Sequence, residues 1–232
     1  MARRRLSHKI VIDYLRSIGS GGLPEGAAMP TESMLCEEYQ VGRSVVREAL
    51  QALDAKGFII VRQGSVAAVA PRQHWNVLDS DFLNTHSGEE FFAELQTARE
   101  VLEPQIAYLA AANARDSDLR LLEEAHLGVT SQKANPHQHA QADIGFHRSL
   151  ALAAGNSVLS SFHDSLTSLG KRTRLASAAV PGAIDRAHAW HQEILDAVRA
   201  GDSDCAAAAM RLHLRQVRGE LLELDALRQL DH

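Results

Sequence analysis

The chain has 232 residues, a length that fits one large domain or two modest ones, and its formal net charge of −5 excludes a globally basic nucleic-acid coat protein. Its two cysteines, Cys36 and Cys205, lie far apart in sequence and exclude a disulfide framework, and the longest apolar stretches are too short to span a membrane. We therefore expect a cytoplasmic protein without a signal peptide or a membrane partner.

The charge is unevenly distributed along the chain. Residues 1–70 carry a net charge of +2, and residues 71–232 carry −7. A mildly basic segment ahead of an acidic body is compatible with a local DNA-binding surface.

Three helices are predicted in the basic segment. Apolar residues at helical spacing indicate a first helix over residues 6–19, with Ser7 as its N-cap. A short second helix follows Thr31, and a third helix ends at Gly57. The break at Gly42 between the second and third helices is short enough to let them cross steeply.

A β-hairpin is predicted after the third helix. Residues 58–70 read as two short strands around a tight turn at Gln63 and Gly64. Three helices followed by a hairpin is the order of elements in a winged helix-turn-helix domain, which we expect over residues 1–70.

The third predicted helix carries two arginines on one face. Arg43 and Arg47 are four residues apart, and Ser44 lies beside the first of them. The expected buried face consists of Val46, Leu50 and Leu53. A guanidinium fork matches the O6 and N7 acceptors of guanine and contributes about 1–3 kcal/mol of discrimination per base pair. A solvated basic face is the alternative, but the order of elements favours DNA recognition.

Residues 6–70 resemble the DNA-binding domain of the GntR family of regulators. That domain has a Pro-x-Glu-x-x-Leu helix and a Ser-Arg-x-x-Val-Arg-Glu-Ala-Leu recognition helix. The matching residues are Pro30, Glu32, Leu35, Arg43, Val46, Arg47, Glu48, Ala49 and Leu50. The chain departs from the pattern at Gly42, where the family usually has Ser or Thr, and at Ser33, which is often Arg. These departures imply fewer phosphate contacts and weaker nonspecific binding.

The resemblance implies how each side chain contacts DNA. Arg43 and Arg47 would read base edges in the major groove, and Ser44 would contact a phosphate. Gln63 and Gly64 would form the tip of the wing at the minor groove. A homodimer would then place two such heads on a palindromic operator of double-stranded DNA.

The rest of the chain is predicted to be helical after a linker. Residues 71–90 are turn-prone and are expected to link the two domains. The helices expected in residues 91–228 cover 91–114, 116–131, 137–154, 157–178, 183–200 and 203–228. Apolar residues recur in them every three or four positions, which predicts an antiparallel all-α bundle of six to seven helices. The predicted fold class is therefore mainly α.

A metal site is suggested by spacing in this second half. Asp143 and His147 are four residues apart on one predicted helix, so both side chains lie on one face and can share a divalent ion. His191 and His213 lie on later helices that can converge on the same point. Asp plus three His would leave one or two coordination positions open. His188 is a rival ligand to His191, whereas His137 and His139 are expected to be exposed.

Residues 91–225 resemble the FCD effector domain of the FadR subfamily. The matching positions are Arg99 and Glu103, Asp143 and His147, Gly155 and Asn156, His191, and His213. The resemblance implies that the Asp and the three His bind Zn²⁺, with nickel or manganese as alternatives. It also implies that the open positions accept a carboxylate of the effector, and that Arg99 clamps that carboxylate. Arg172 and Arg174 are weaker candidates for the same pocket. An ion pair with Glu103 on the helix surface is the alternative role of Arg99.

The function expected from these features is transcription regulation, without enzymatic activity. A small organic acid would bind the metal and favour a dimer whose heads no longer match the half-site spacing, which releases a repressor from DNA. The stretch Trp75–Leu83 resembles a linker of relatives that respond to sugar acids. A metal-dependent hydrolase, a sensor of the metal itself, and an activator are the alternatives, although no HExxH-like helix supplies a general base for hydrolysis.

Overall fold

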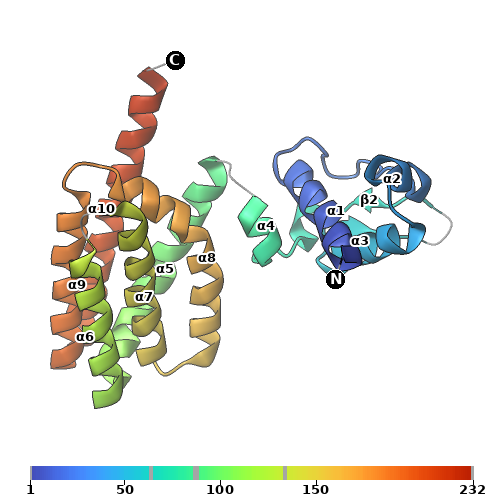
Figure 1. Cartoon of the computed structure of the whole chain (residues 1–232). Helices are drawn as coiled ribbons and strands as arrows, with labels where there is room; N and C mark the ends of the chain where they lie inside the picture. The colour runs from blue at the N-terminus through green and yellow to red at the C-terminus, as the bar shows by residue number, and fades with distance from the viewer. Residues whose placement is uncertain (1, 63–64, 86–88, 133–134, 231–232) are drawn as a thin grey trace. The chain divides into compact units, whose positions relative to one another are not determined.

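The structure is a computed structural model that describes residues 2–62, 65–85, 89–132 and 135–230. It divides into two compact units, Met1–Phe91 and Phe92–His232, which are described separately below (Figure 1). Gln63 and Gly64, the predicted wing tip, lie outside the described residues.

The first unit has the predicted order of three helices and a hairpin. Its elements are α1 (Ala2–Gly19), α2 (Glu32–Tyr39), α3 (Arg43–Ala55), β1 (Ile59–Ile60) and β2 (Ala68–Val69). The two strands are antiparallel, with Ile59 opposite Val69, and Ala28 forms a further bridge to Ala68. The predicted winged helix-turn-helix fold is confirmed.

The first helix begins earlier than expected, so the assignment of Ser7 as its N-cap was wrong. α1 already includes Ala2, because the alanine and arginines that follow Met1 are strong helix formers. Ser7 is buried inside the helix and donates a hydrogen bond to Glu48 Oε1 of α3 at 3.1 Å. Its hydroxyl therefore fastens α1 to α3 and does not cap a helix.

Local capping determines the helix-turn-helix. The Thr31 hydroxyl accepts a hydrogen bond from the Met34 backbone N–H, as expected of the cap of α2. α2 ends at Tyr39, and its C-cap Gln40 has a left-handed φ of 52°. Gly42 precedes α3 and has no side chain, so the first N–H groups of α3 receive no side-chain cap from it.

The segment predicted as a linker contains short helices that pack on the first unit. They are η1 (Arg72–His74) and α4 (Ser80–Thr85). The rings of Phe58, Trp75 and Phe82 form a cluster with centroids 4.7 to 6.1 Å apart, and Trp75 Nε1 donates to the Ala70 carbonyl at 2.8 Å. Gly57 makes this approach possible, because a Cβ there would lie 2.1 Å from a backbone oxygen of η1.

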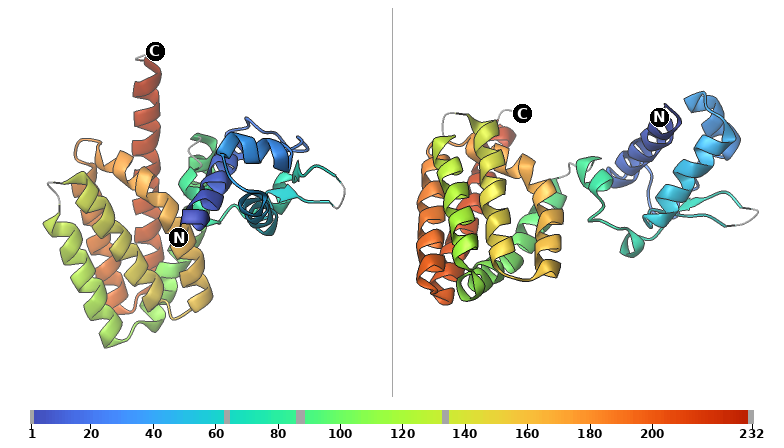
Figure 2. Two further views of the ribbon diagram at one scale, coloured as in Figure 1. Left: turned by 45° about the vertical axis from the view of Figure 1, so that its right-hand side comes forward. Right: turned by 60° about the horizontal axis from the view of Figure 1, so that its bottom comes forward.

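The second unit is a bundle of six helices among the described residues. They are α5 (Glu89–Asn113), α6 (Asp116–Ser131), α7 (Pro136–Ala153), α8 (Ser157–Ala178), α9 (Ala183–Ala200) and α10 (Ser203–Leu230). Neighbouring helices in the chain pack together, α6 with α7, α7 with α8, and α9 with α10, as two views of the bundle show (Figure 2). The predicted helical bundle is confirmed.

The core of the bundle draws on α5, α6, α7, α9 and α10, and Leu159 of α8 packs against it. Its largest fully buried members are Ile106, Leu122, Phe146, Leu150, Ile194, Met210 and Leu214. Burying a side chain of this size contributes about 1.5–3 kcal/mol. Within the described residues, no helix combines the length and the apolarity needed to cross a bilayer.

Candidate metal centre and nucleic-acid interface

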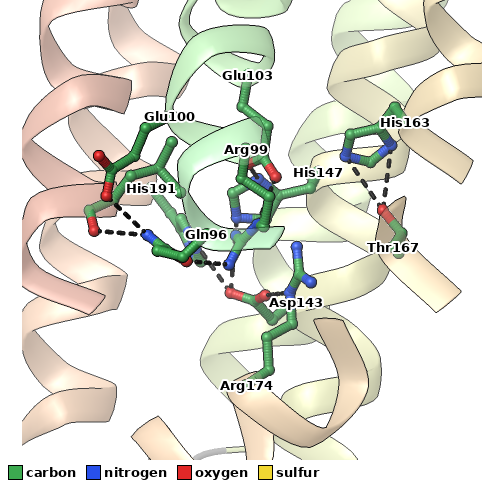
Figure 3. A network of polar contacts seen from close by, with 11 residues as sticks. Gln96, Arg99, Glu100, Glu103, Asp143, His147, His163, Thr167, Arg174 and His191 are labelled. Carbon is green, nitrogen blue, oxygen red and sulfur yellow. Dashed lines mark hydrogen bonds and ion pairs between the residues drawn. The ribbon is translucent and has the colours of Figure 1, made fainter. Parts of the chain in front are cut away.

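The four predicted metal ligands meet inside the bundle. α7 contributes Asp143 and His147 one turn apart, α9 contributes His191, and α10 contributes His213. All four are buried, and one ligand atom of each lies within 4.8 Å of those of the others. The i,i+4 spacing on α7 and the packing of α7, α9 and α10 thus produce a single cluster, of which Figure 3 labels Asp143, His147 and His191.

The distances inside this cluster suit a shared ion. His191 Nε2 lies 3.2 Å from Asp143 Oδ1, and His147 Nε2 lies 3.8 Å from the same oxygen. The ring centroids of His191 and His213 are 4.7 Å apart. Ligand atoms that bind one ion at about 2.1 Å are about 3 to 4 Å from one another, so small side-chain movements would complete the coordination.

The buried nitrogens of the cluster also fit a cation. Both ring nitrogens of His147 and of His191, and Nδ1 of His213, lack a hydrogen-bond partner among the described residues. Orphaned polar atoms are rare in protein interiors, and three imidazoles around a carboxylate form a common donor set for zinc and similar ions. The residues present therefore fit a divalent metal.

The protonation states in this cluster favour metal binding. Burial lowers the pKa of His147 and holds that of His213 well below its usual range, so both rings are neutral at physiological pH. Burial alone would raise the pKa of Asp143, but the nearby His147 and Arg174 outweigh it and hold the pKa well below the usual range. A deprotonated carboxylate with neutral imidazoles is the form that coordinates an ion.

Two other histidines lie differently from the four. His188, the rival ligand, stacks on His126 with ring centroids 4.7 Å apart and is not part of the cluster. His139 is buried, so the expectation that it is exposed was wrong. It lies one turn before Asp143 on α7 and therefore faces the same side of that helix.

Arg99 is buried on α5 together with Glu103. Arg99 Nε donates to Glu103 Oε1 at 2.7 Å, and Nη1 donates to Gln96 Oε1 at 3.2 Å. The ion pair that was considered as an alternative therefore exists, but inside the bundle and not on its surface: the two residues are 1% and 2% exposed. Arg99 also lines the pocket described next, so the pair and the pocket are compatible.

A small, partly open pocket adjoins the cluster. The residues that line it are Arg99, His139, Asp143, Arg174, Ser177, Ala178, Ala183, Ile184, Ala187, His213 and Val217. Charged and polar groups lie at the metal cluster, and small apolar side chains of α8, α9 and α10 form the remaining wall. A ligand with one anionic end fits this division.

Arg174 is a pocket residue with unused hydrogen-bonding capacity. Its Nε donates to Asp143 Oδ2, whereas Nη1 and Nη2 are buried without a hydrogen-bond partner in the described part of the chain. Burial and the nearby Arg99 lower the pKa of this guanidinium. A guanidinium fork of this kind can take a carboxylate through two parallel hydrogen bonds.

Several buried polar groups near the site were missed in the sequence. They are Gln96, His163, Thr167, Ser177 and Glu220. Burial lowers the pKa of His163 to about 4, and the Thr167 hydroxyl lies 3.3 Å from its ring. Ser177 donates to Glu220, which also binds Arg186 at 2.9 Å. The spacing of His163 and Thr167, four apart on one helix face, was the available signal.

The predicted DNA-contacting side chains of α3 lie at the surface. Arg43, Ser44 and Arg47 are all exposed, and Val46, Leu50 and Leu53 are buried on the opposite face. Arg47 Nε donates to both carboxylate oxygens of Glu32 at 3.0 Å, and this contact raises the pKa of the arginine. The structure leaves Arg43 and Ser44 accessible at the start of α3.

Two family models match the chain, one for each unit. Residues 8–69 match the model described as bacterial regulatory proteins, gntR family, and residues 94–216 match the FCD domain. The two matches coincide with the helix-turn-helix unit and with the bundle that holds the buried cluster.

Curated relatives match nearly the whole chain. The galactonate operon transcriptional repressor of Escherichia coli (strain K12) is 31% identical over 87% of this chain and 90% of its own length. The HTH-type transcriptional repressor NanR of Klebsiella aerogenes is 30% identical over 94% of this chain and 85% of its own.

Solved structures support the same fold. A GntR protein of Streptococcus agalactiae is 27% identical, with a TM-score of 0.53 over 91% of this chain and 98% of its own. The Listeria monocytogenes protein Lar, described as controlling the expression of the agr system, is 16% identical with a TM-score of 0.64 over 94% of this chain and 97% of its own.

Proposed function

Because the chain belongs to the GntR family of bacterial regulatory proteins and carries an FCD domain, we propose that it is a repressor released from its operator by a small carboxylate. The family and the relatives are transcription regulators, so the chain is a DNA-binding regulator and not an enzyme. Repression is proposed because both curated relatives are repressors. As a homodimer, the protein would place two α3 helices on a palindromic operator.

The effector domain is proposed to hold one divalent ion, with Zn²⁺ first and Ni²⁺ or Mn²⁺ as alternatives. Asp143, His147, His191 and His213 would be its ligands, and the observation that carries the proposal is the convergence of their buried ligand atoms within 4.8 Å. When bound, such an ion supplies a Lewis acid that attracts an oxygen ligand. Four protein ligands leave one or two positions for it in a five- or six-coordinate site.

The effector is proposed to be a small organic acid in the adjoining pocket. The unpartnered Nη1 and Nη2 of Arg174 would grip its carboxylate next to the ion, and Arg99 would add positive charge at the same end. These unpartnered nitrogens favour an acid over the metal ion alone as the signal. Sugar acids are the first class to test, because one relative represses a galactonate operon.

Release from DNA would follow from a change in the dimer. An acid that binds one dimer geometry better than another shifts the population toward it by the difference in affinity. If the distance between the two DNA-binding units in the favoured geometry no longer matches the spacing of the operator half-sites, the protein leaves the operator.

A thermal-shift series tests the effector site. Sugar acids such as galactonate should raise the melting temperature of the zinc-loaded chain, since a ligand at 100 times its Kd stabilises by about 2.7 kcal/mol. Arg174→Gln should abolish this rise and still bind zinc, because the four proposed ligands remain in place.

A surface arginine in the same unit serves as the control. Arg199→Gln removes a guanidinium that pairs with Glu123 at 2.9 Å outside the pocket, so it should keep the full rise. A rise that survives in Arg174→Gln would exclude Arg174 as the carboxylate anchor. If no acid shifts the melting temperature of the wild type, while zinc alone changes its affinity for the operator, the result would support a metal sensor instead.

The contact between Glu32 and Arg47 gives a second test, on the DNA side. Glu32 holds Arg47 through Nε and adds a negative charge next to the predicted DNA surface. Glu32→Gln should therefore strengthen binding to random-sequence duplex and weaken discrimination at the base that Arg47 reads. Fluorescence anisotropy with matched and mismatched duplexes measures both, and Glu37→Gln, an exposed carboxylate on the same helix, is the control. Equal changes in the two variants would show a general charge effect only.

A further inference from the structure

The carboxylate of Glu103 lies between Arg99, which lines the pocket, and His147, a predicted metal ligand. Its Oε1 accepts the hydrogen bond from Arg99 Nε at 2.7 Å, and its Oε2 lies 2.9 Å from His147 Nδ1 (Figure 3). Glu103 is 2% exposed, so water does not screen either contact. One buried carboxylate thus links the effector end of the site to the metal cluster.

We propose that Glu103 is a positioning residue that orients His147 for the ion. An imidazole whose Nδ1–H points at a carboxylate keeps the Nε2 lone pair for a metal, and the carboxylate also increases the basicity of the ring. His147 Nε2 is the nitrogen that faces Asp143, 3.8 Å from Oδ1. This inference rests on the proposed metal site and adds a residue that does not touch the ion.

The local geometry supports this role for Glu103. Neither Glu103 Oε2 nor His147 Nδ1 has another hydrogen-bond partner among the described residues. The two atoms are close but not aligned as a hydrogen bond, and a small rotation of the imidazole would align them. Glu103 Oε2 can therefore accept the hydrogen bond that His147 Nδ1–H has free to donate.

A second metal site is the rival interpretation of the same residues. Ligand atoms of Glu103, His147 and His163 also lie within 4.8 Å of one another. The Arg99 guanidinium, however, already occupies the other oxygen of Glu103 and places a positive charge beside it. His147 would also have to lose both ring protons to bridge two ions, so the arrangement favours one ion per chain.

Arg99 extends this arrangement to the pocket. Arg99 both donates a hydrogen bond to Glu103 and lines the pocket. An acid that binds Arg99 therefore contacts the same guanidinium that orients Glu103. Metal affinity and acid affinity should therefore depend on each other, and the dependence must be reciprocal. Arg99→Gln should lower zinc affinity by a smaller factor than Glu103→Gln does, because it removes only the partner of the carboxylate.

The test compares zinc affinity across variants of the full chain. Competition with a chromophoric chelator should show a loss of roughly 10- to 100-fold in Glu103→Gln. The control is Glu220→Gln, which alters another buried carboxylate held by an arginine but away from the four ligands, and it should stay within about twofold of wild type. Glu103→Asp keeps the charge with a shorter reach and should lie between wild type and Glu103→Gln, which preserves the test if the glutamine variant does not fold.

A second readout separates positioning from mere stability. Side-chain ¹⁵N NMR of the zinc-loaded protein should show His147 protonated at Nδ1 in the wild type and a changed signal in Glu103→Gln. Wild-type protein that binds no zinc would overturn the proposed metal site itself. Tight wild-type binding with unchanged affinity in Glu103→Gln, an unchanged His147 signal, or two ions per chain would overturn this inference alone.

Discussion

Replacing Arg43 by alanine is expected to abolish most sequence-specific binding to the operator. Arg43 is exposed at the first turn of α3, where its guanidinium can reach a guanine edge. Each half-site should lose about 1–3 kcal/mol, so a dimer with two such contacts loses about 2–6 kcal/mol, a factor of at least 30. The operator can be selected from a random duplex library with the wild-type protein and then titrated at fixed salt.

Comparison with nonspecific DNA decides whether Arg43 reads a base. The Arg43→Ala variant should lose far less affinity for random duplex than for the selected operator. Arg148→Ala removes an exposed arginine of the bundle and should leave both affinities unchanged. If Arg43→Ala weakened operator and random duplex equally, Arg43 would be a phosphate contact and the base-reading role would be wrong.

Replacing His191 by alanine is expected to remove metal binding. His191 is 0% exposed and lies 3.2 Å from Asp143 Oδ1, at the centre of the four side chains. Loss of one direct ligand should cost more than the loss of an outer partner, hence more than about 100-fold in zinc affinity. Metal analysis after dialysis and chelator competition measure this loss directly.

The same variant should lose the stabilisation that zinc gives. Chelation should lower the melting temperature of the wild type by on the order of 10 °C, from the stabilisation by a ligand well above its Kd and the dependence of the melting temperature on free energy. His191→Ala should show no such drop, whereas His188→Ala, one turn earlier on α9 and outside the cluster, should behave like the wild type. Full zinc affinity in His191→Ala would remove His191 from the ligand set.

The fold was largely predictable because its signals are local. Helix breaks at Asn135-Pro136, Gly155-Asn156 and Gly201 place the starts of α7, α8 and α10 within one residue of those expected. Ser7 was misassigned because a serine near a chain start reads as a cap in sequence, and only the packing of α1 on α3 shows that its partner is Glu48. The packing of Trp75 on Phe58 likewise depends on tertiary structure.

The candidate site was only half predictable, for a physical reason. The i,i+4 pair of Asp143 and His147 is visible in sequence because one helix face fixes it. The environment of each group is set by several helices at once, and spacing does not reveal it. Thus the burial of His139, the unpartnered nitrogens of Arg174 and the double contact of Glu103 appear only in three dimensions.

The unpartnered nitrogens of Arg174 have a consequence for the amount of protein in the cell. A buried guanidinium with unused donors costs free energy, and an acid that occupies it relieves that cost. Under the proposed function, the acid-free form would then open more often and be cleaved more readily by cellular proteases. If the proposed function is right, supply of the acid should lengthen the lifetime of the protein that it removes from DNA, so that repression would return without new synthesis once the acid is consumed.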